Sequence, residues 1–319
     1  MQSGEIEAHD IYNGGNRIRV SIYKPENVGE EMCIDEKYIN QDFYTVLSNP
    51  KTNKIAALIQ STKSNLLAQA LHKMGSKLLI VKTLNRDLSQ TYDWVGRQVF
   101  MNAQHVADKF HVMRHAFDSL QSIRIAIKNF EAQAVADAEQ AHLARELKFK
   151  KEHKEKYDFH YQIKPYKHKY EILENGDTIP QLLARSRYLL FKPKGKWSSN
   201  QKARAEILFK RYPDLGRAHE LIISFRKWFS SENIGKQRKT ILKQLNRWYK
   251  NIKEFNLAHL SLFSALVKRN EGSIMNYFKQ GSTNAKAEAM NSRIQSFIHS
   301  NRGVRNLDFF LYRLAGFFS

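Results

Sequence analysis

The sequence predicts an α/β protein whose core is a mixed five-stranded sheet with helices, interrupted by a large all-α insertion. Three observations support this prediction. Strand-like and helix-like segments alternate along the first third of the chain, strand signals stop near residue 116, and helical periodicity continues to about residue 280. The predicted parts are a lead-in (1–30), the first part of the core (31–115), the all-α insertion (116–280) and a closing helix with a C-terminal tail (281–319).

Three strands in quick succession open the predicted core. Residues 31–39 and 42–48 are rich in apolar and β-branched side chains, and residues 55–60 resume the same pattern. The intervening segment SNPKTNK (48–54) contains the Pro and Asn residues that are typical of a tight turn. We therefore expect three antiparallel strands.

Helices and strands then alternate along the chain. The predicted elements are a capped helix that ends at Gly75 (61–75), a strand buried on both faces (77–87), a helix (88–100), a short strand (103–108) and the start of a further helix (109–127). The resulting order is three strands, helix, strand, helix, strand, helix. This order is that of the ribonuclease H-like fold, in which the first and fourth strands are neighbours at the centre of the sheet.

Composition favours a nucleic-acid partner. The 319 residues include 52 Lys and Arg against 31 Asp and Glu, a net charge of +21, which attracts polyanions. The chain has no apolar run long enough to span a membrane and no apolar segment at its N-terminus, so we expect a cytoplasmic protein without a membrane partner. With Cys33 as its one cysteine, the chain can form neither an internal disulfide nor a Cys-based zinc cluster.

The predicted insertion is helical and basic. Apolar residues recur at spacings of three and four, which indicates a core-facing stripe of Ile241, Leu245, Trp248, Ile252 and Phe255. Segment 148–170 is basic with interleaved aromatic residues. Such a run is either a solvated helix face or linker, or a surface that contacts nucleic acid.

Carboxylates are scarce in so basic a chain, so their positions are informative. Asp35 and Glu36 directly follow the apolar strand residues 32–34, where an unpaired buried charge would be costly. Asp87 ends the predicted fourth strand, which lies beside the first in a ribonuclease H-like sheet. Glu288, on the predicted closing helix, could bring a third carboxylate to the same point.

Three converging carboxylates suit phosphodiester chemistry with two metal ions. Two divalent ions roughly 4 Å apart stabilise both the attacking and the leaving oxygen. We therefore expect Asp35, Asp87 and Glu288 to bind two Mg²⁺ ions, with Mn²⁺ as a substitute. Each assignment has an alternative, because Asp87 could instead cap the helix that follows it and Glu288 could be an ordinary exposed helix residue.

Four segments resemble the signature blocks of bacterial insertion-sequence DDE transposases. They are CIDEKY (33–38), LNRDLSQTYDWV (84–95), AQHVADKFHVMRHAFDSL (103–120) and STNAKAEAMNSRIQ (282–295). The D-x-F-H and T-N-x-x-x-E-x-x-N blocks among them are similar to those of the ISL3-like branch. Segments 187–201 and 212–229 also resemble the insertion region of that branch.

The resemblance implies a metal-binding triad of Asp35, Asp87 and Glu288. Asp108 and His111 match a C/D-x-x-H motif that lies beside the active site in related families, and Asn291 belongs to the closing-helix block. We expect these three residues to support the triad without belonging to it. Asp108 is nevertheless the main competitor for the second position, since it too follows a strand.

The resemblance also implies a transposase catalytic subunit that cleaves DNA at the ends of an insertion sequence and transfers the strand to target DNA. It would act as a homo-oligomer on DNA, in the cytoplasm and associated with the bacterial nucleoid. The predicted contacts with the DNA backbone are Lys192, Lys194, Lys196, Arg293, Arg302 and Arg305. Two rival functions are an inactive or domesticated DNA-binding descendant and a related nuclease such as a junction resolvase.

One departure from the family pattern concerns DNA reading. Full-length members usually begin with a zinc ribbon and a helix-turn-helix segment that recognise the element's ends. Here the first predicted core strand starts near residue 31, and a single cysteine excludes a four-cysteine ribbon. We therefore expect a separately encoded subunit to supply the DNA-reading part.

Overall fold

The computed structural model describes most of the chain. The residues it describes are 9–13, 16–153, 162–279, 281–301 and 306–319. Internal contacts divide the chain into two units: unit 1 comprises residues 1–114, 228–246 and 264–319, and unit 2 comprises residues 115–227 and 247–263.

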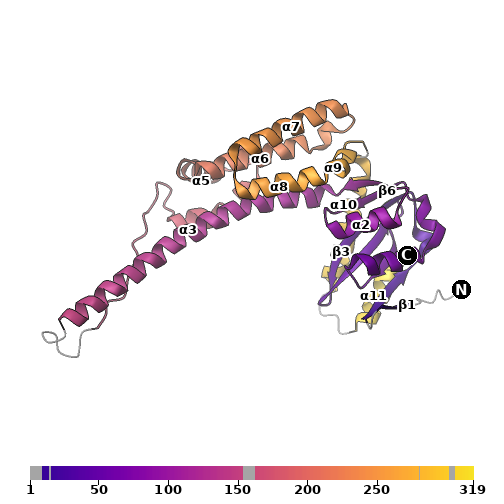
Figure 1. The fold of residues 1–319 in the computed structure, drawn as a ribbon, viewed down its shortest axis with the longest axis horizontal. Coiled ribbons are helices and arrows are strands. Elements are labelled where there is room, and N and C mark those ends of the chain that lie inside the picture. The colour runs from indigo at the N-terminus through magenta and orange to yellow at the C-terminus, as the bar shows by residue number, and fades with distance from the viewer. Residues whose placement is uncertain (1–8, 14–15, 154–161, 280, 302–305) are drawn as a thin grey trace. The chain divides into compact units, whose positions relative to one another are not determined.

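Unit 1 contains a mixed seven-stranded sheet (Figure 1). Its strands are β1 (His9–Asn13), β2 (Asn16–Tyr23), β3 (Glu31–Ile39), β4 (Asp42–Asn49), β5 (Lys54–Ile59), β6 (Thr83–Arg86) and β7 (Gln104–Ala107). They are arranged in the order β1-β2-β5-β4-β3-β6-β7. Strand β3 pairs antiparallel with β4 and parallel with β6, and β6 pairs parallel with β7. The predicted α/β class is confirmed, and all five predicted strands are present.

The sheet has two strands more than predicted, because part of the expected lead-in belongs to it. Strands β1 and β2 form a hairpin, and β2 pairs antiparallel with β5. The sequence NRIRVSIY of β2 places Ile18, Val20 and Ile22 at alternate positions, which is the period of a strand. This alternation is the signal that would have identified the additional strand.

The predicted fourth strand, residues 77–87, is only partly extended. Its first residues belong to the 3₁₀ helix η2 (Gly75–Ile80), and β6 contains four residues. Gly75 adopts a φ of 60°, which turns the chain sharply after helix α1 (Ser64–His72). Leu79 and Ile80 are exposed, whereas Leu78, Val81 and Leu84 are core residues, so the run is not buried on both faces along its whole length.

Helices cover both faces of the sheet. On one face, α1 and α2 (Gln90–Val99) pack Leu67, Leu71 and Val95 against Met32 and Ile34 of β3. On the other face, α10 (Gly281–Ser300) and α11 (Leu307–Phe317) contribute a second apolar cluster, which includes Met290, Ile294, Leu311 and Leu314 and reaches Ile39 of β3. Because side chains alternate along a strand, Asp35 and Lys37 point to the face that α10 covers.

The remaining α-helices lie between β7 and α10 along the chain. They are α3 (Lys109–Glu152), α4 (Ile179–Arg185), α5 (Ser199–Arg211), α6 (Pro213–Trp228), α7 (Arg238–Phe255), α8 (Ala258–Arg269) and α9 (Glu271–Tyr277), with 3₁₀ segments at Pro25–Asn27, Leu189–Phe191, Lys194–Lys196 and Ser231–Asn233. In unit 2, Trp248 packs against Phe225 and Phe263. In the ranges that the structure describes, no helix is both long and apolar enough to cross a membrane.

Candidate active site

Asp35 is a buried carboxylate whose two oxygens are both engaged. The Lys37 ammonium donates to Oδ2 at 2.6 Å, the backbone N–H of Glu36 donates to Oδ1 at 2.8 Å, and His111 Nε2 lies 3.4 Å from Oδ1. Burial raises the pKa of Asp35, but the His111 hydrogen bond and the Lys37 charge outweigh it, and the pKa falls to about 2. Asp35 is therefore ionised at neutral pH.

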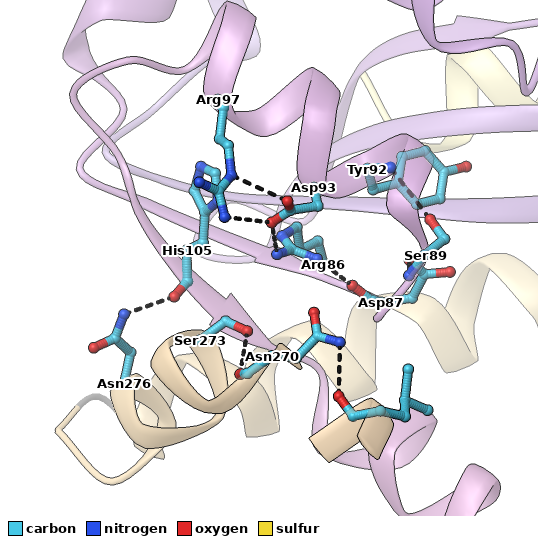
Figure 2. Close-up of polar contacts among 11 residues, drawn as sticks. Arg86, Asp87, Ser89, Tyr92, Asp93, Arg97, His105, Asn270, Ser273 and Asn276 are labelled. Atoms are coloured by element: carbon cyan, nitrogen blue, oxygen red, sulfur yellow. Dashed lines mark hydrogen bonds and ion pairs between the residues drawn. The ribbon is translucent and has the colours of Figure 1, made fainter. Parts of the chain in front are cut away.

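Asp87 is brought next to Asp35 by the parallel pairing of β3 and β6. Ile34 lies opposite Arg86 in this pair, so Asp35 and Asp87 are the next residues along the two neighbouring strands. The Asp87 carboxylate accepts the backbone N–H of Ser89 at 2.7 Å. Ser89, rather than Asp87, is the N-cap of α2 and accepts the backbone N–H of Tyr92 (Figure 2).

The end of β6 is tied to α2 through a buried arginine. Arg86 donates to the backbone carbonyl of Asp87 at 2.8 Å and forms an ion pair with Asp93 of α2. Arg97 approaches the same Asp93 carboxylate with its Nε at 3.0 Å (Figure 2). The Arg86 side chain is only 2% exposed. Its bonds to the Asp87 carbonyl and to Asp93 fix the backbone of Asp87 at the end of β6. The sequence reading missed Arg86; its position inside an otherwise buried strand is the signal that called for a carboxylate partner.

Asp108 occupies the corresponding position at the end of β7. Its carboxylate accepts the backbone N–H of Phe110 at 2.7 Å, as Asp87 does with Ser89, and its own N–H donates to the carbonyl of Arg86. Burial raises the pKa of Asp108 and outweighs the charge of His111. Asp108 thus caps the start of helix α3. This structural role is the alternative to a role in metal binding.

A cavity of about 670 Å³ lies over these residues within unit 1. Its wall includes the four carboxylates of Asp35, Glu36, Asp108 and Glu288, the cations Lys37 and Arg114, the histidines His111 and His299, and Asn291. Burial, followed by the charge of Asp108, raises the pKa of Glu288. The structure therefore brings Asp35, Asp108 and Glu288 from distant parts of the sequence to one cavity.

Asp87 is not among the described residues that line this cavity, although it lies close to them. Burial raises the pKa of Glu36, and the charges of Asp87 and Asp35 raise it further. Asp87 is also half-buried, whereas Asp108 is buried inside the cavity wall. The assignment of Asp87, rather than Asp108, as the second metal-binding carboxylate stays a prediction.

The donor chemistry of the cavity fits a hard divalent cation, since carboxylate oxygens are the ligands that Mg²⁺ prefers. In the part of the chain that the structure describes, however, no three His, Cys, Asp or Glu side chains are placed to hold one metal ion. The Lys37 ammonium contacts Asp35 where a bound cation would. To form a metal site, the carboxylate side chains would have to move closer together and Lys37 would have to leave Asp35.

The predicted DNA contacts lie in different places. Lys192, Lys194 and Lys196 are exposed in unit 2, where Lys194 pairs with Glu220 at 2.6 Å. Arg293 is exposed on α10, with its guanidinium 5.8 Å from the ring centre of Phe318. Arg302 and Arg305 lie outside the described residues.

The sequence reading also missed Lys37 and Arg114 as members of the site. Lys37 follows Asp35 by two residues on a strand, a spacing that places both side chains on one face. Arg114 follows His111 by three residues on α3, so the helical period brings it to the same side. Both signals were present in the sequence.

Comparison with known protein families gives a match over most of the chain. The family model DDE_Tnp_ISL3, described as a transposase, matches residues 32–314. This range includes every residue that lines the carboxylate cavity. No match to the chain was found among the curated proteins.

Proposed function

Because the chain belongs to the DDE_Tnp_ISL3 transposase family, we propose that it is the subunit that cuts DNA at the ends of an insertion sequence and joins the freed strand to target DNA. The observation that carries this proposal is the convergence of Asp35, Asp108 and Glu288 on one cavity, with Asp87 beside Asp35 at the end of a parallel strand pair. Acids from distant segments that meet in one cavity are expected at a site of chemistry.

The proposal includes a ribonuclease H-like core. Three consecutive antiparallel strands, β3 to β5, followed by the parallel strands β6 and β7 support it. In such a core Asp35, Asp87 and Glu288 would bind the metal ions, with Asp108 as the rival for the second position. Two bound Mg²⁺ ions, or Mn²⁺ in their place, would supply Lewis acidity to the attacking and leaving oxygens of the phosphodiester.

The residues in and near the cavity divide into four tasks. His111 and the N–H of Glu36 hold the Asp35 carboxylate in a fixed orientation. Arg86 holds the backbone of Asp87 in place through its bond to the Asp87 carbonyl. Arg114 and Lys37 supply positive charge in the cavity wall, opposite the phosphate of a DNA strand. Asn291 offers an amide that can donate to DNA or to a carboxylate.

Further contacts with the DNA backbone would come from Lys192, Lys194, Lys196 and Arg293, all exposed. The transposase family implies DNA as the partner. We further propose a homo-oligomer on DNA and a separately encoded subunit that reads the element's ends.

The test is a cleavage assay with labelled element-end DNA and Mg²⁺, with and without the candidate partner subunit. Asp35→Asn keeps the shape of the carboxylate but removes its charge, so we expect cleavage to be lost. DNA affinity should stay the same or rise slightly, because repulsion toward phosphate falls. An Asp35→Asn chain that cleaves at the wild-type rate would exclude the catalytic role.

The same assay identifies the second acid. If Asp87 binds metal, Asp87→Asn should abolish cleavage, and Asp108→Asn should have a smaller effect, because Asn accepts the same N–H at the start of α3 as Asp does. The reverse pattern would assign the second position to Asp108. DNA binding without cleavage by the wild-type chain, under all metal and partner conditions, would instead support a DNA-binding descendant.

A further inference from the structure

Lys37 is a buried cation inside the carboxylate cavity. The residue is 7% exposed, and its ammonium lies 2.6 Å from Asp35 Oδ2. Burying an ammonium group is costly unless a negative charge compensates for it. Lys37 therefore depends on Asp35, and Asp35 depends in turn on Lys37 and His111.

This arrangement leaves no free oxygen on Asp35. Lys37 takes Oδ2, and Oδ1 accepts the Glu36 N–H and faces His111. A divalent cation that binds Asp35 through Oδ2 would lie beside the Lys37 ammonium, and repulsion between the two positive charges would favour displacement of the ammonium. Once displaced, the ammonium remains in the cavity wall and needs a new anion.

A DNA phosphate is the anion that would enter the cavity together with the metal. We propose that Lys37 is a counter-ion that occupies Asp35 in the free chain and passes to a DNA phosphate when the cation binds. Lys37 is then a positioning residue that couples cation binding to DNA binding. This inference rests on the proposed function, since it requires DNA and a divalent cation in one cavity.

The coupling has a measurable consequence. In the wild-type chain, duplex DNA should tighten Mn²⁺ binding, because the phosphate stabilises the displaced ammonium. By linkage, Mn²⁺ should tighten DNA binding by the same factor. We expect a factor on the order of tenfold, within the range that is ordinary for two coupled sites.

Substitution of Lys37 removes the competitor. Lys37→Met should tighten Mn²⁺ binding to the DNA-free chain by on the order of tenfold and remove most of the effect of DNA, if the coupling has its ordinary size. Lys37→Arg keeps the cation and should behave more like the wild type. Lys82→Met is a matched control, because Lys82 pairs with Glu30 through an exposed ion pair in the same unit.

The experiment is a Mn²⁺ titration of the full chain, followed by calorimetry and by the electron-spin resonance of free Mn²⁺, with and without a scrambled duplex. The proposal is overturned if DNA does not change the Mn²⁺ affinity of the wild-type chain. This arm remains decisive if Lys37→Met does not fold, in which case Lys37→Gln serves as the second variant. Equal Mn²⁺ affinities of folded Lys37→Met and wild-type chains without DNA would also overturn it.

These outcomes are separable from a failure of the proposed function. Mn²⁺ binding that depends on Asp35 but not on Lys37, together with normal cleavage, would leave the transposase proposal intact and remove only the role of Lys37. Absence of both Mn²⁺ binding and cleavage would reject both proposals.

Discussion

Three groups of ion-paired residues, each with a buried member, show how single residues divide between stability and chemistry. Arg86 is paired with Asp93 at the end of β6, and Asp177 is paired with Arg185 and Arg204 in unit 2. Both groups of residues connect separate elements, as expected of structural ion pairs. Asp35 differs, because its partner Lys37 shares a cavity with further carboxylates. The excess of carboxylates around this pair is what favours the proposed replacement of the Lys37 ammonium by a metal ion.

Asp177 provides a pH-dependent test at the residue scale. Burial raises its pKa, but the hydrogen bonds and charges of Arg204 and Arg185 lower it overall. A lowered folded pKa contributes stability that is present above the unfolded value, about 3.9, and is lost as the pH falls through the folded value. Asp177→Asn should therefore cost about 1–3 kcal/mol in the free energy of unfolding at pH 7, and less below about pH 4.

Urea unfolding followed by tryptophan fluorescence measures this difference. Trp197 and Trp248 both lie in unit 2, so their emission reports on the affected region. Asp137→Asn is the control, since Asp137 is exposed on α3 and its carboxylate accepts a hydrogen bond from Gln133, one helical turn away. A stability difference for Asp177→Asn that stays constant from pH 7 to about pH 3 would contradict the assigned role.

At the scale of elements, the parallel pairing of β3 and β6 is the feature that builds the site. It places Asp35 and Asp87 at adjacent strand ends, and the parallel β7 adds Asp108 to the same edge. Helix α10 contacts β3 and β6 and brings Glu288 and Asn291 to the cavity. Parallel strands end at a common edge, so acids that follow them gather there without any local signal that pairs them.

The ion pair between β6 and α2 allows a prediction at this scale. Asp93→Asn would leave the buried Arg86 guanidinium without its charged partner, so it should cost about 3 kcal/mol in the free energy of unfolding. Arg97→Ala removes the exposed partner of the same carboxylate and should cost no more than about 0.5 kcal/mol. Urea unfolding of both variants checks the difference. Similar costs would mean that Arg86 does not depend on Asp93.

At the scale of the whole molecule, the net charge and the family both indicate DNA as the partner. The net charge of +21 predicts a polyanionic partner, and the match over residues 32–314 confirms the resemblance to ISL3-like transposases. The cavity and its acids belong to unit 1, whereas the exposed Lys192, Lys194 and Lys196 belong to unit 2. DNA-backbone contacts are thus expected from both units, since Arg293 lies in unit 1 with the acids.

The chain alone should bind DNA with little sequence preference and a steep dependence on salt. Affinity that comes from phosphate contacts should fall by roughly 10³-fold or more between 50 and 200 mM salt for six or more contacts. Titrations with element-end and scrambled duplexes at several salt concentrations measure both quantities. A preference of about 10³-fold for element-end DNA would show that this chain reads sequence itself.

The sequence alone was sufficient for the five core strands, the helical character of the later segments and the family. These features depend on local periodicity, on the order of segments and on motifs, all of which are written along the chain. The predicted stripe on α7 is one example, because Ile241, Leu245, Trp248 and Ile252 are buried, while its fifth member, Phe255, is half-buried.

Only the tertiary structure decided which distant side chains meet. It placed Asp108, rather than Asp87, in the cavity wall with Asp35 and Glu288, and it paired the β1–β2 hairpin with β5 in the sheet. The reason is physical: strand register, the direction of each side chain and the burial of charge depend on contacts between segments that are far apart in sequence. Local patterns carry no record of those contacts.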